Sequence, residues 1–336
     1  MDMTRYLRFS GWCLVLLAMV FAAPAEAQTC LTHSDMDEPT RSALEAVAKR
    51  YFDMAARGDA AGLKQNAIPS LASDFSSVET AVKDNQHSIA AAQAEARPAF
   101  LLKVEGDKPL ARAEFLCGVF DKNGQTANSA AFMIPNLSPG TYGVATMEVS
   151  GSERPLTVTF VLQQQGPDWK IGGFYVRPSQ VAGHDAGWFA AKASAFKAKG
   201  QNRDAWLYYQ QARELAVPVP FMYTQTTDKL YDESQAVKPN DLPTDDNTVD
   251  LVAGAKTYKL TAVFPVAVGQ DLDVVVKYQA TDVSHTDETF KNNMAVIQAL
   301  VTKYPEFRDA FAGVVARAVE PSGQDYGSLL PMKEIK

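Results

Sequence analysis

Few residues of this sequence are spaced so that they could act together in a reaction. Its four histidines, His33, His87, His184 and His285, are scattered along the chain. The sequence contains no His-Glu-x-x-His, no Gly-x-Ser-x-Gly, no cysteine pair at metal-binding spacing and no glycine loop that would hold a phosphate. Because such patterns bring metal ligands, nucleophiles or phosphate-binding amides together, we predict no metal site, no cofactor and no catalytic motif.

One carboxylate and one tyrosine on neighbouring predicted strands could still support acid–base chemistry. Side chains alternate along a strand, which places Tyr142, Thr146 and Glu148 on one face of their strand. By the same rule Trp169 and Tyr175 share a face of the last strand. If both faces turn inward, Glu148 and Tyr175 are weak candidates for a general acid and base. In that orientation Tyr142, Thr146 and Trp169 line a ligand cavity.

The opposite orientation of these strands is favoured, because it buries a purer apolar set. In that register Glu148 is exposed to water and cannot serve as a buried base. The side chains that then face inward are Met147, Val149, Phe160, Leu162 and Phe174.

A polar and aromatic cluster follows these strands. His184 and Asp185 precede Trp188, which makes the group a candidate site. An aspartate that follows a glycine and precedes a helical pattern is more often an N-cap. We therefore expect Asp185 to begin a helix.

The elements that would position these residues are helices first and strands afterwards. Leu44, Val47, Tyr51 and Phe52 recur at helical spacing within residues 38–55. Strand-like runs begin after Pro98 and are separated by Gly, Asn, Asp and Pro. They are Phe100–Val104, Ala111–Phe120, Ala130–Ile134, Tyr142–Val149, Leu156–Gln164 and Trp169–Val176. This order predicts an α+β fold in which N-terminal helices pack on a bent antiparallel sheet.

The first half of the chain resembles the nuclear transport factor two-like superfamily. The matching residues are the opening helix with Tyr51-Phe52, the Gly58-Asp59 stop, and the closing hairpin at 157–162 and 169–174. The resemblance covers residues 36–178 and implies a cone-shaped domain. Related proteins include enzymes with a carboxylate and a tyrosine in an apolar pocket, ligand carriers and structural modules, so the resemblance does not select a function.

The rest of the chain is predicted to form a connector and a second domain. Residues 184–217 resemble one tetratricopeptide-type helical hairpin, which we expect to pack on the cone domain, and a short helix near 226–236 follows. Residues 237–247 are rich in Pro and Asp and contain little to pack, so they are the expected linker. The predicted divisions are a cone-like domain at 28–178, a helical connector at 179–236, the linker, and a small α+β domain at 248–336.

The N-terminus has the features of a secretory signal peptide. Arg5 and Arg8 precede an apolar run at 12–23 and the small-residue site Ala25-Glu26-Ala27. We expect cleavage after Ala27 and a periplasmic or secreted mature protein. The alternative is a lipoprotein acylated on Cys30, although Gln28 and Thr29 stand where such signals have small residues.

Export leaves two cysteines, Cys30 and Cys117, for which a disulfide is the expected pairing, with two free thiols as the alternative. The net charge of −7 and the lack of clustered basic residues argue against nucleic-acid binding. No later segment approaches the about 18 apolar residues of a membrane span.

The sequence thus favours an exported binding or assembly module whose partner is a small apolar ligand or an envelope protein. The alternative is a small-molecule isomerase, dehydratase or hydrolase that acts inside the cone.

Overall fold

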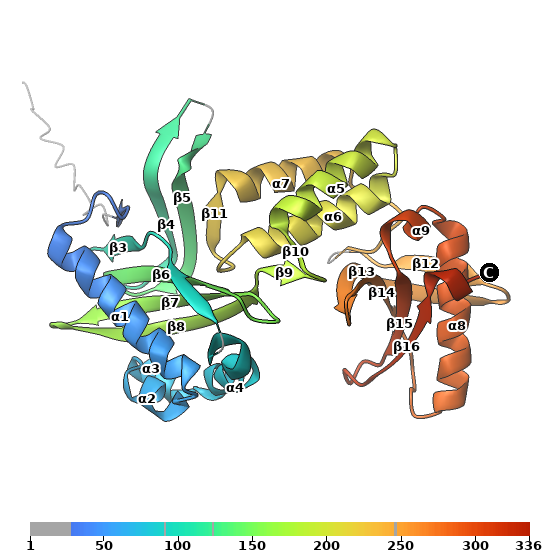
Figure 1. The fold of residues 1–336 in the computed structure, drawn as a ribbon, viewed down its shortest axis with the longest axis horizontal. Coiled ribbons are helices and arrows are strands. Elements are labelled where there is room, and N and C mark those ends of the chain that lie inside the picture. The colour runs from blue at the N-terminus through green and yellow to red at the C-terminus, as the bar shows by residue number, and fades with distance from the viewer. Residues whose placement is uncertain (1–27, 91, 123, 245–246) are drawn as a thin grey trace, which may run out of the picture.

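A computed structural model describes residues 28–90, 92–122, 124–244 and 247–336 (Figure 1). The chain forms helices and several largely antiparallel sheets, which confirms the mixed α+β class. The predicted signal peptide, residues 1–27, lies outside the described residues.

The N-terminal part consists of four helices on one face of a sheet (Figure 1). The helices are α1 (Glu38–Ala56), α2 (Ala60–Gln65), α3 (Pro69–Ser73) and α4 (Ser76–Ala90). The strand order is β1 (Gln28–Leu31), β3 (Phe100–Val104), β6 (Gly140–Ser150), β7 (Leu156–Gln165) and β8 (Asp168–Pro178), and β2 (Gln93–Ala96) pairs with β6. Asp37 caps α1 by accepting a hydrogen bond from the Thr40 amide at 2.7 Å.

The core between the helices and this sheet is filled by large side chains. Leu44, Tyr51 and Phe52 of α1 pack there against the sheet. The residues of the favoured register, Met147, Val149, Phe160, Leu162 and Phe174, are all buried in the same cluster. The sequence prediction of the inward face is therefore confirmed.

A second, smaller sheet extends from the N-terminal part as an arm (Figure 1). The arm is the hairpin of β4 (Leu110–Asp121) and β5 (Gly124–Leu137), and β11 (Met222–Thr224) pairs with β5. Phe115 and Phe132 of the arm pack with Leu102 and Val144 of the first sheet. The first sheet is thus covered on both faces, by helices on one and by the base of the arm on the other.

The connector is a helical hairpin with a short ribbon before it and a third helix after it. Its elements are β9 (Gln180–Val181), β10 (His184–Asp185), α5 (Ala186–Ala198), α6 (Asn202–Ala216) and α7 (Gln225–Ala236). The buried residues of α5 and α6 belong to one core cluster with the C-terminal sheet. The Tyr208 hydroxyl donates to the Ala310 carbonyl at 2.5 Å across that junction. The hairpin contacts the N-terminal part through the ion pair between Arg177 of β8 and Glu214 of α6, whereas its aromatic face is buried against the C-terminal part.

The C-terminal part is a five-stranded sheet with one long helix on it (Figure 1). In sheet order the strands are β12 (Val249–Ala253), β13 (Lys256–Val268), β14 (Asp271–Gln279), β15 (Gly313–Val319) and β16 (Asp325–Pro331). Strands β14 and β15 are parallel because α8 (Thr286–Lys303) and α9 (Phe307–Ala310) cross between them. A short turn of 3-10 helix, Met332–Glu334, ends the fold.

Part of the expected linker at 237–247 is packed. Val237 and Leu242 are 5% and 1% exposed and belong to the core shared by the connector and the C-terminal sheet. The Arg203 guanidinium also binds the Asp241 carboxylate, with 2.6 Å between Nη2 and Oδ2. The expectation that this segment packs little is wrong, because its two aliphatic side chains insert into the core between its polar residues.

Candidate functional site

The candidate base Glu148 lies in a surface ion pair. It stands on β6 opposite Thr157 of β7, and its side chain is 40% exposed. Its carboxylate accepts a hydrogen bond from the Arg97 guanidinium. Such a carboxylate is solvated and already paired, and neither condition favours a buried general base.

Tyr175 shares a sheet face with Glu148 but contacts other residues. On β8, Arg177 pairs with Thr157 and Tyr175 pairs with Thr159, two residues further along. Tyr175 therefore lies two strands across the sheet and two residues along it from Glu148, which places their Cα atoms roughly 12 Å apart. The Tyr175 ring packs edge-on against Phe221 at 5.6 Å between centroids, and burial raises the pKa of its hydroxyl. The structure does not bring the two candidates together as an acid–base pair.

The three predicted cavity residues lie on opposite faces of the sheet. The Thr146 hydroxyl is 3.1 Å from that of Thr159, and the Tyr142 hydroxyl donates to the Ser138 carbonyl at 2.8 Å. Trp169 instead belongs to the core under the helices, where its carbonyl accepts a 2.6 Å hydrogen bond from the Tyr51 hydroxyl. Tyr142 packs in the core beneath the arm. The side chains of Tyr142 and Trp169 therefore line no common cavity.

A bulge in β8 explains this separation. Val161 pairs with Gly173, whereas the next residue, Leu162, pairs with Ile171, so Gly172 is the extra residue. One inserted residue reverses the alternation of side chains along a strand. The prediction that Trp169 and Tyr175 share a face is wrong for this reason.

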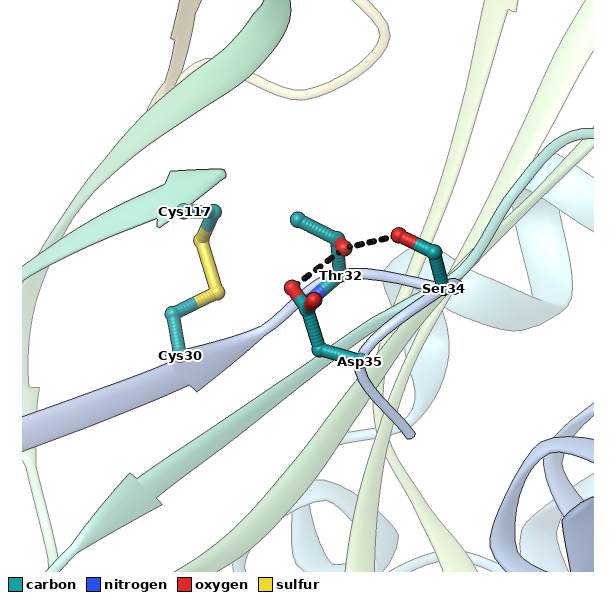
Figure 2. Close-up of a disulfide and its surroundings, with 5 residues drawn as sticks. All are labelled: Cys30, Thr32, Ser34, Asp35 and Cys117. Atoms are coloured by element: carbon teal, nitrogen blue, oxygen red, sulfur yellow. Dashed lines mark hydrogen bonds between the residues drawn. A yellow bond between two sulfur atoms is a disulfide. The ribbon is translucent and has the colours of Figure 1, made fainter. Parts of the chain in front are cut away.

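The predicted Cys30–Cys117 disulfide is present (Figure 2). The sulfur atoms are 1.98 Å apart and the Cα atoms 5.1 Å apart. Cys30 lies on β1 and Cys117 is fully buried on β4, so the bond ties the edge of the first sheet to the arm. Just after β1, the Thr32 hydroxyl and amide both donate to the Asp35 carboxylate, and these bonds lower the pKa of Asp35.

The cluster that contains His184 and Trp188 starts a helix. The two rings stack with centroids 3.6 Å apart and planes 4° apart. The Asp185 carboxylate accepts a hydrogen bond from the Trp188 amide at 2.9 Å and so caps α5. The N-cap interpretation of Asp185 is confirmed, and these contacts account for the cluster structurally.

A buried carboxyl group that sequence reasoning missed lies at the start of α6. Asp204 has no exposed surface, and its two oxygens have no hydrogen-bond partner among the described residues. Burial, followed by the charges of Glu306 and Asp309, raises its pKa to about 7. Arg203 beside it makes ion pairs with Asp241 and Glu306. An acid in a first helical turn normally indicates a solvated N-terminus, so no sequence signal distinguished this one.

The described residues contain no cluster of three or more His, Cys, Asp or Glu that could hold a metal ion. No helix within the described ranges has the length and apolar character needed to cross a membrane. Comparison with known proteins finds no matching family model, no matching curated protein and no matching solved structure.

Proposed function

We propose that this chain is an exported binding or assembly module of the cell envelope, which acts through its surfaces. The observation that carries the proposal is a set of exposed apolar side chains on the arm. Leu116 and Val119 of β4 are 67% and 63% exposed, and Met133 on the neighbouring strand is 37% exposed. Leu116 pairs with Ala131, so Met133 is its diagonal neighbour on the same face. Grouped apolar side chains on a projecting element are typical of protein contact surfaces.

The arm is held in place on both sides, which favours binding. The disulfide fixes β4, and β11 adds a strand to β5. The Gln125 amide near the tip donates to Asp228 of α7 at 2.5 Å, and Gln225 donates to the Gln125 carbonyl at 3.0 Å. Because the arm is ordered before it meets a partner, little conformational entropy is lost on association.

The proposed location is the periplasm or the exterior, after cleavage near Ala27. Two features support it: the predicted signal at residues 1–27 and the Cys30–Cys117 bond, since disulfides persist in oxidising compartments. Strand β1 begins at Gln28, the residue after the expected cleavage position, and its Cys30 is used in the disulfide. A disulfide at Cys30 also disfavours the lipoprotein alternative, which needs that thiol for acylation.

The proposed architecture includes a cone-type domain at 36–178 and a tetratricopeptide-like hairpin at 184–217. Helices on one face of a six-stranded sheet support the first, and the antiparallel pair α5 and α6 supports the second. The alternative function, an isomerase, dehydratase or hydrolase inside the cone, is less favoured. Its two candidate groups, Glu148 and Tyr175, have separate partners, and large side chains fill the space under the helices.

A photo-crosslinking experiment in cells that export the protein tests this function. A benzophenone amino acid replaces Leu116 or Val119 and, as a matched control, the exposed Glu79 of α4. We expect both arm positions, but not the Glu79 position, to crosslink to the same discrete envelope protein. Leu116→Ser in the Val119 crosslinking variant should weaken that product. Equal products from Glu79, or no product from the arm, would contradict the proposal.

A further inference from the structure

Strand β12 is an outer strand of the C-terminal sheet, and one of its edges is free. Among the described residues it pairs with β13 alone. The two strands are joined by the two-residue turn Gly254-Ala255, in which Gly254 has a φ of +63°. In such a hairpin the flanking pair Ala253 and Lys256 is hydrogen-bonded, so the N–H and C=O groups of Val252 point away from β13.

The carbonyl of Asp250, two residues earlier, points to the same free edge. It accepts a hydrogen bond from the Lys303 ammonium at 3.4 Å. Val252 is 67% exposed, and β12 contains neither a proline nor a bulge that would block pairing. An unprotected edge of this kind is a template for another strand.

A groove of about 660 Å³ lies between this edge and helix α8. The residues that line it come from β12 and its turn, Asp250, Val252, Ala253 and Gly254, and from one stripe of α8, Ala295, Gln298, Ala299, Thr302 and Lys303. The α8 residues recur at the spacing of one helix face. Small side chains on both walls, Ala253 and Gly254 facing Ala295 and Ala299, leave the room that another side chain would fill.

Lys303 stands at one end of the groove and, after Arg203, is one of the cations that lower the pKa of Asp241. The Lys303 ammonium contacts the Asp250 carbonyl and lies 5.2 Å from the centre of the Tyr304 ring, and neither group carries a negative charge. No salt bridge within the described ranges includes Lys303. A ligand with a carboxylate at this position would complete an ion pair.

We propose that the groove between β12 and α8 binds an extended segment of a partner protein, which adds a strand to β12 and places a carboxylate against Lys303. The N–H and C=O groups of Val252, which point away from β13, fit a ligand whose main chain is extended. Because side chains alternate along a strand, every second ligand residue enters the groove over Ala299. The site is separate from the β4–β5 arm and does not depend on it.

A random-dodecapeptide display library, selected on the chain from residue 28 to its end, tests the proposal. We expect enriched sequences with apolar residues at alternate positions and an Asp or Glu, or a free C-terminal carboxylate, at one end. A synthetic peptide of the enriched sequence should increase hydrogen-exchange protection of the Val252 amide. No enriched sequence, or protection elsewhere only, would overturn the proposal.

Two variants examine the geometry with that peptide. Val252→Pro removes one free-edge N–H and no bond to β13, so binding should weaken at least about tenfold, whereas Val252→Thr keeps the N–H and should bind nearly as the parent does. Lys303→Glu should weaken binding of the acidic peptide and strengthen binding of a version with Lys in place of the acid. This exchange does not depend on whether the proline variant folds.

A different occupant would be indicated if the protein formed a concentration-dependent dimer and Val252→Pro abolished that dimer. Such a dimer would assign the edge to a second copy of the chain and overturn the peptide proposal. Equal peptide affinity of Val252→Pro and Val252→Thr, with both variants folded, would overturn it as well.

Discussion

The two large sheets of this protein differ at their outer strands: β1 is covered by the arm, whereas β12 has an unpaired edge among the described residues. The outer strand β1 of the N-terminal sheet is linked to β4 by the Cys30–Cys117 disulfide. The Gln28 side-chain oxygen also accepts a hydrogen bond from the Glu114 amide of β4 at 2.5 Å. The outer strand β12 of the C-terminal sheet has a free edge beside a groove. The N-terminal sheet thus holds the arm, whereas the C-terminal sheet leaves one edge of β12 unpaired among the described residues.

The two sheets also differ in what fixes them to the rest of the chain. The N-terminal sheet is packed between helices and the arm, with a covalent link at its edge. The C-terminal sheet shares its core with the connector, at a junction that contains the buried Asp204. We therefore expect the first arrangement to respond to reduction of the disulfide and the second to pH.

Removing the disulfide should produce the largest difference between the two regions. Its cysteines are 87 residues apart, and the chain-entropy estimate for such a loop is about 4 to 5 kcal/mol of stability. We expect Cys30→Ser with Cys117→Ser to lower the free energy of unfolding of the N-terminal part by up to this amount. Hydrogen exchange resolved by segment would show faster exchange in β1 and β4 and unchanged exchange in β14.

The matched control is the native protein in a reducing agent, which should behave like the double variant. The double variant itself should not respond to the reductant. Equal acceleration of exchange in both sheets would contradict the assignment of the disulfide to the N-terminal part alone.

Replacing Asp204 should change the pH dependence of the C-terminal junction. Burial raises its pKa from 3.8 to about 7, so the folded chain retains a proton that the unfolded chain loses. The associated stability is fully present below the unfolded pKa and is lost as the pH rises through the folded one. The difference corresponds to at most about 4 kcal/mol. Urea unfolding of Asp204→Asn, measured on either side of this window, should lack that decline.

Asp309→Asn provides the control, because it removes one of the charges that raise the pKa of Asp204 while leaving the buried carboxyl in place. Its pH profile should fall between those of the parent and of Asp204→Asn. Parallel profiles for the parent and Asp204→Asn would show that Asp204 does not titrate in this window.

Two tyrosine variants compare the junctions at a smaller energy. Tyr51 and Tyr208 are both buried, and their hydroxyls donate to the carbonyls of Trp169 and Ala310. Each change to Phe removes the hydrogen bond to that carbonyl and leaves the carbonyl unpaired, which costs about 1 to 3 kcal/mol. Tyr51→Phe also removes the hydrogen bond that the Arg50 guanidinium donates to the Tyr51 hydroxyl at 3.0 Å. We expect Tyr51→Phe to accelerate exchange in β8 and Tyr208→Phe to accelerate it around α9. Accelerated exchange around α9 in Tyr51→Phe, or in β8 in Tyr208→Phe, would mean that the two parts unfold together.

The smallest effect is expected for Glu148→Gln. The Arg97 pair is exposed to solvent, and such pairs contribute about 0 to 1 kcal/mol. The unfolding free energies of Glu148→Gln, Arg97→Gln and the double variant give the interaction energy directly. A value well above this range would mean that Glu148 has a role in the N-terminal sheet that its exposure does not suggest.

The sequence predicted the parts of the fold that depend on local patterns. Helical spacing predicted α1, alternation predicted the inward face of β6 and β7, and the cysteine count predicted the disulfide. The prediction that Trp169 and Tyr175 share a face of β8 was wrong, because the extra residue at Gly172 reverses alternation and periodicity alone does not locate it. The burial of the hairpin's aromatic face against the C-terminal sheet was not predicted, because an apolar helix face does not reveal which of two sheets covers it.

The candidate site was less predictable than the fold. Glu148 was correctly expected in water in the favoured register, but its partner Arg97 comes from a loop far away in the sequence. Asp204 gave no signal, because its burial results from packing against α9, more than a hundred residues later. The groove beside β12 depends on strand order and on small side chains of two elements, which become neighbours only in the folded chain.

We infer that the N-terminal part has a filled core and that the protein works through its surfaces. Native mass spectrometry of the protein, purified from the compartment to which its cells export it, tests this claim most directly. We expect the measured mass to equal that of residues 28–336 less the two hydrogens lost in the disulfide, with no small molecule bound. A retained small molecule that protects the amides of β6 and β8 from exchange would contradict the inference of a filled core. It would favour the alternative function, chemistry or ligand binding inside the N-terminal part.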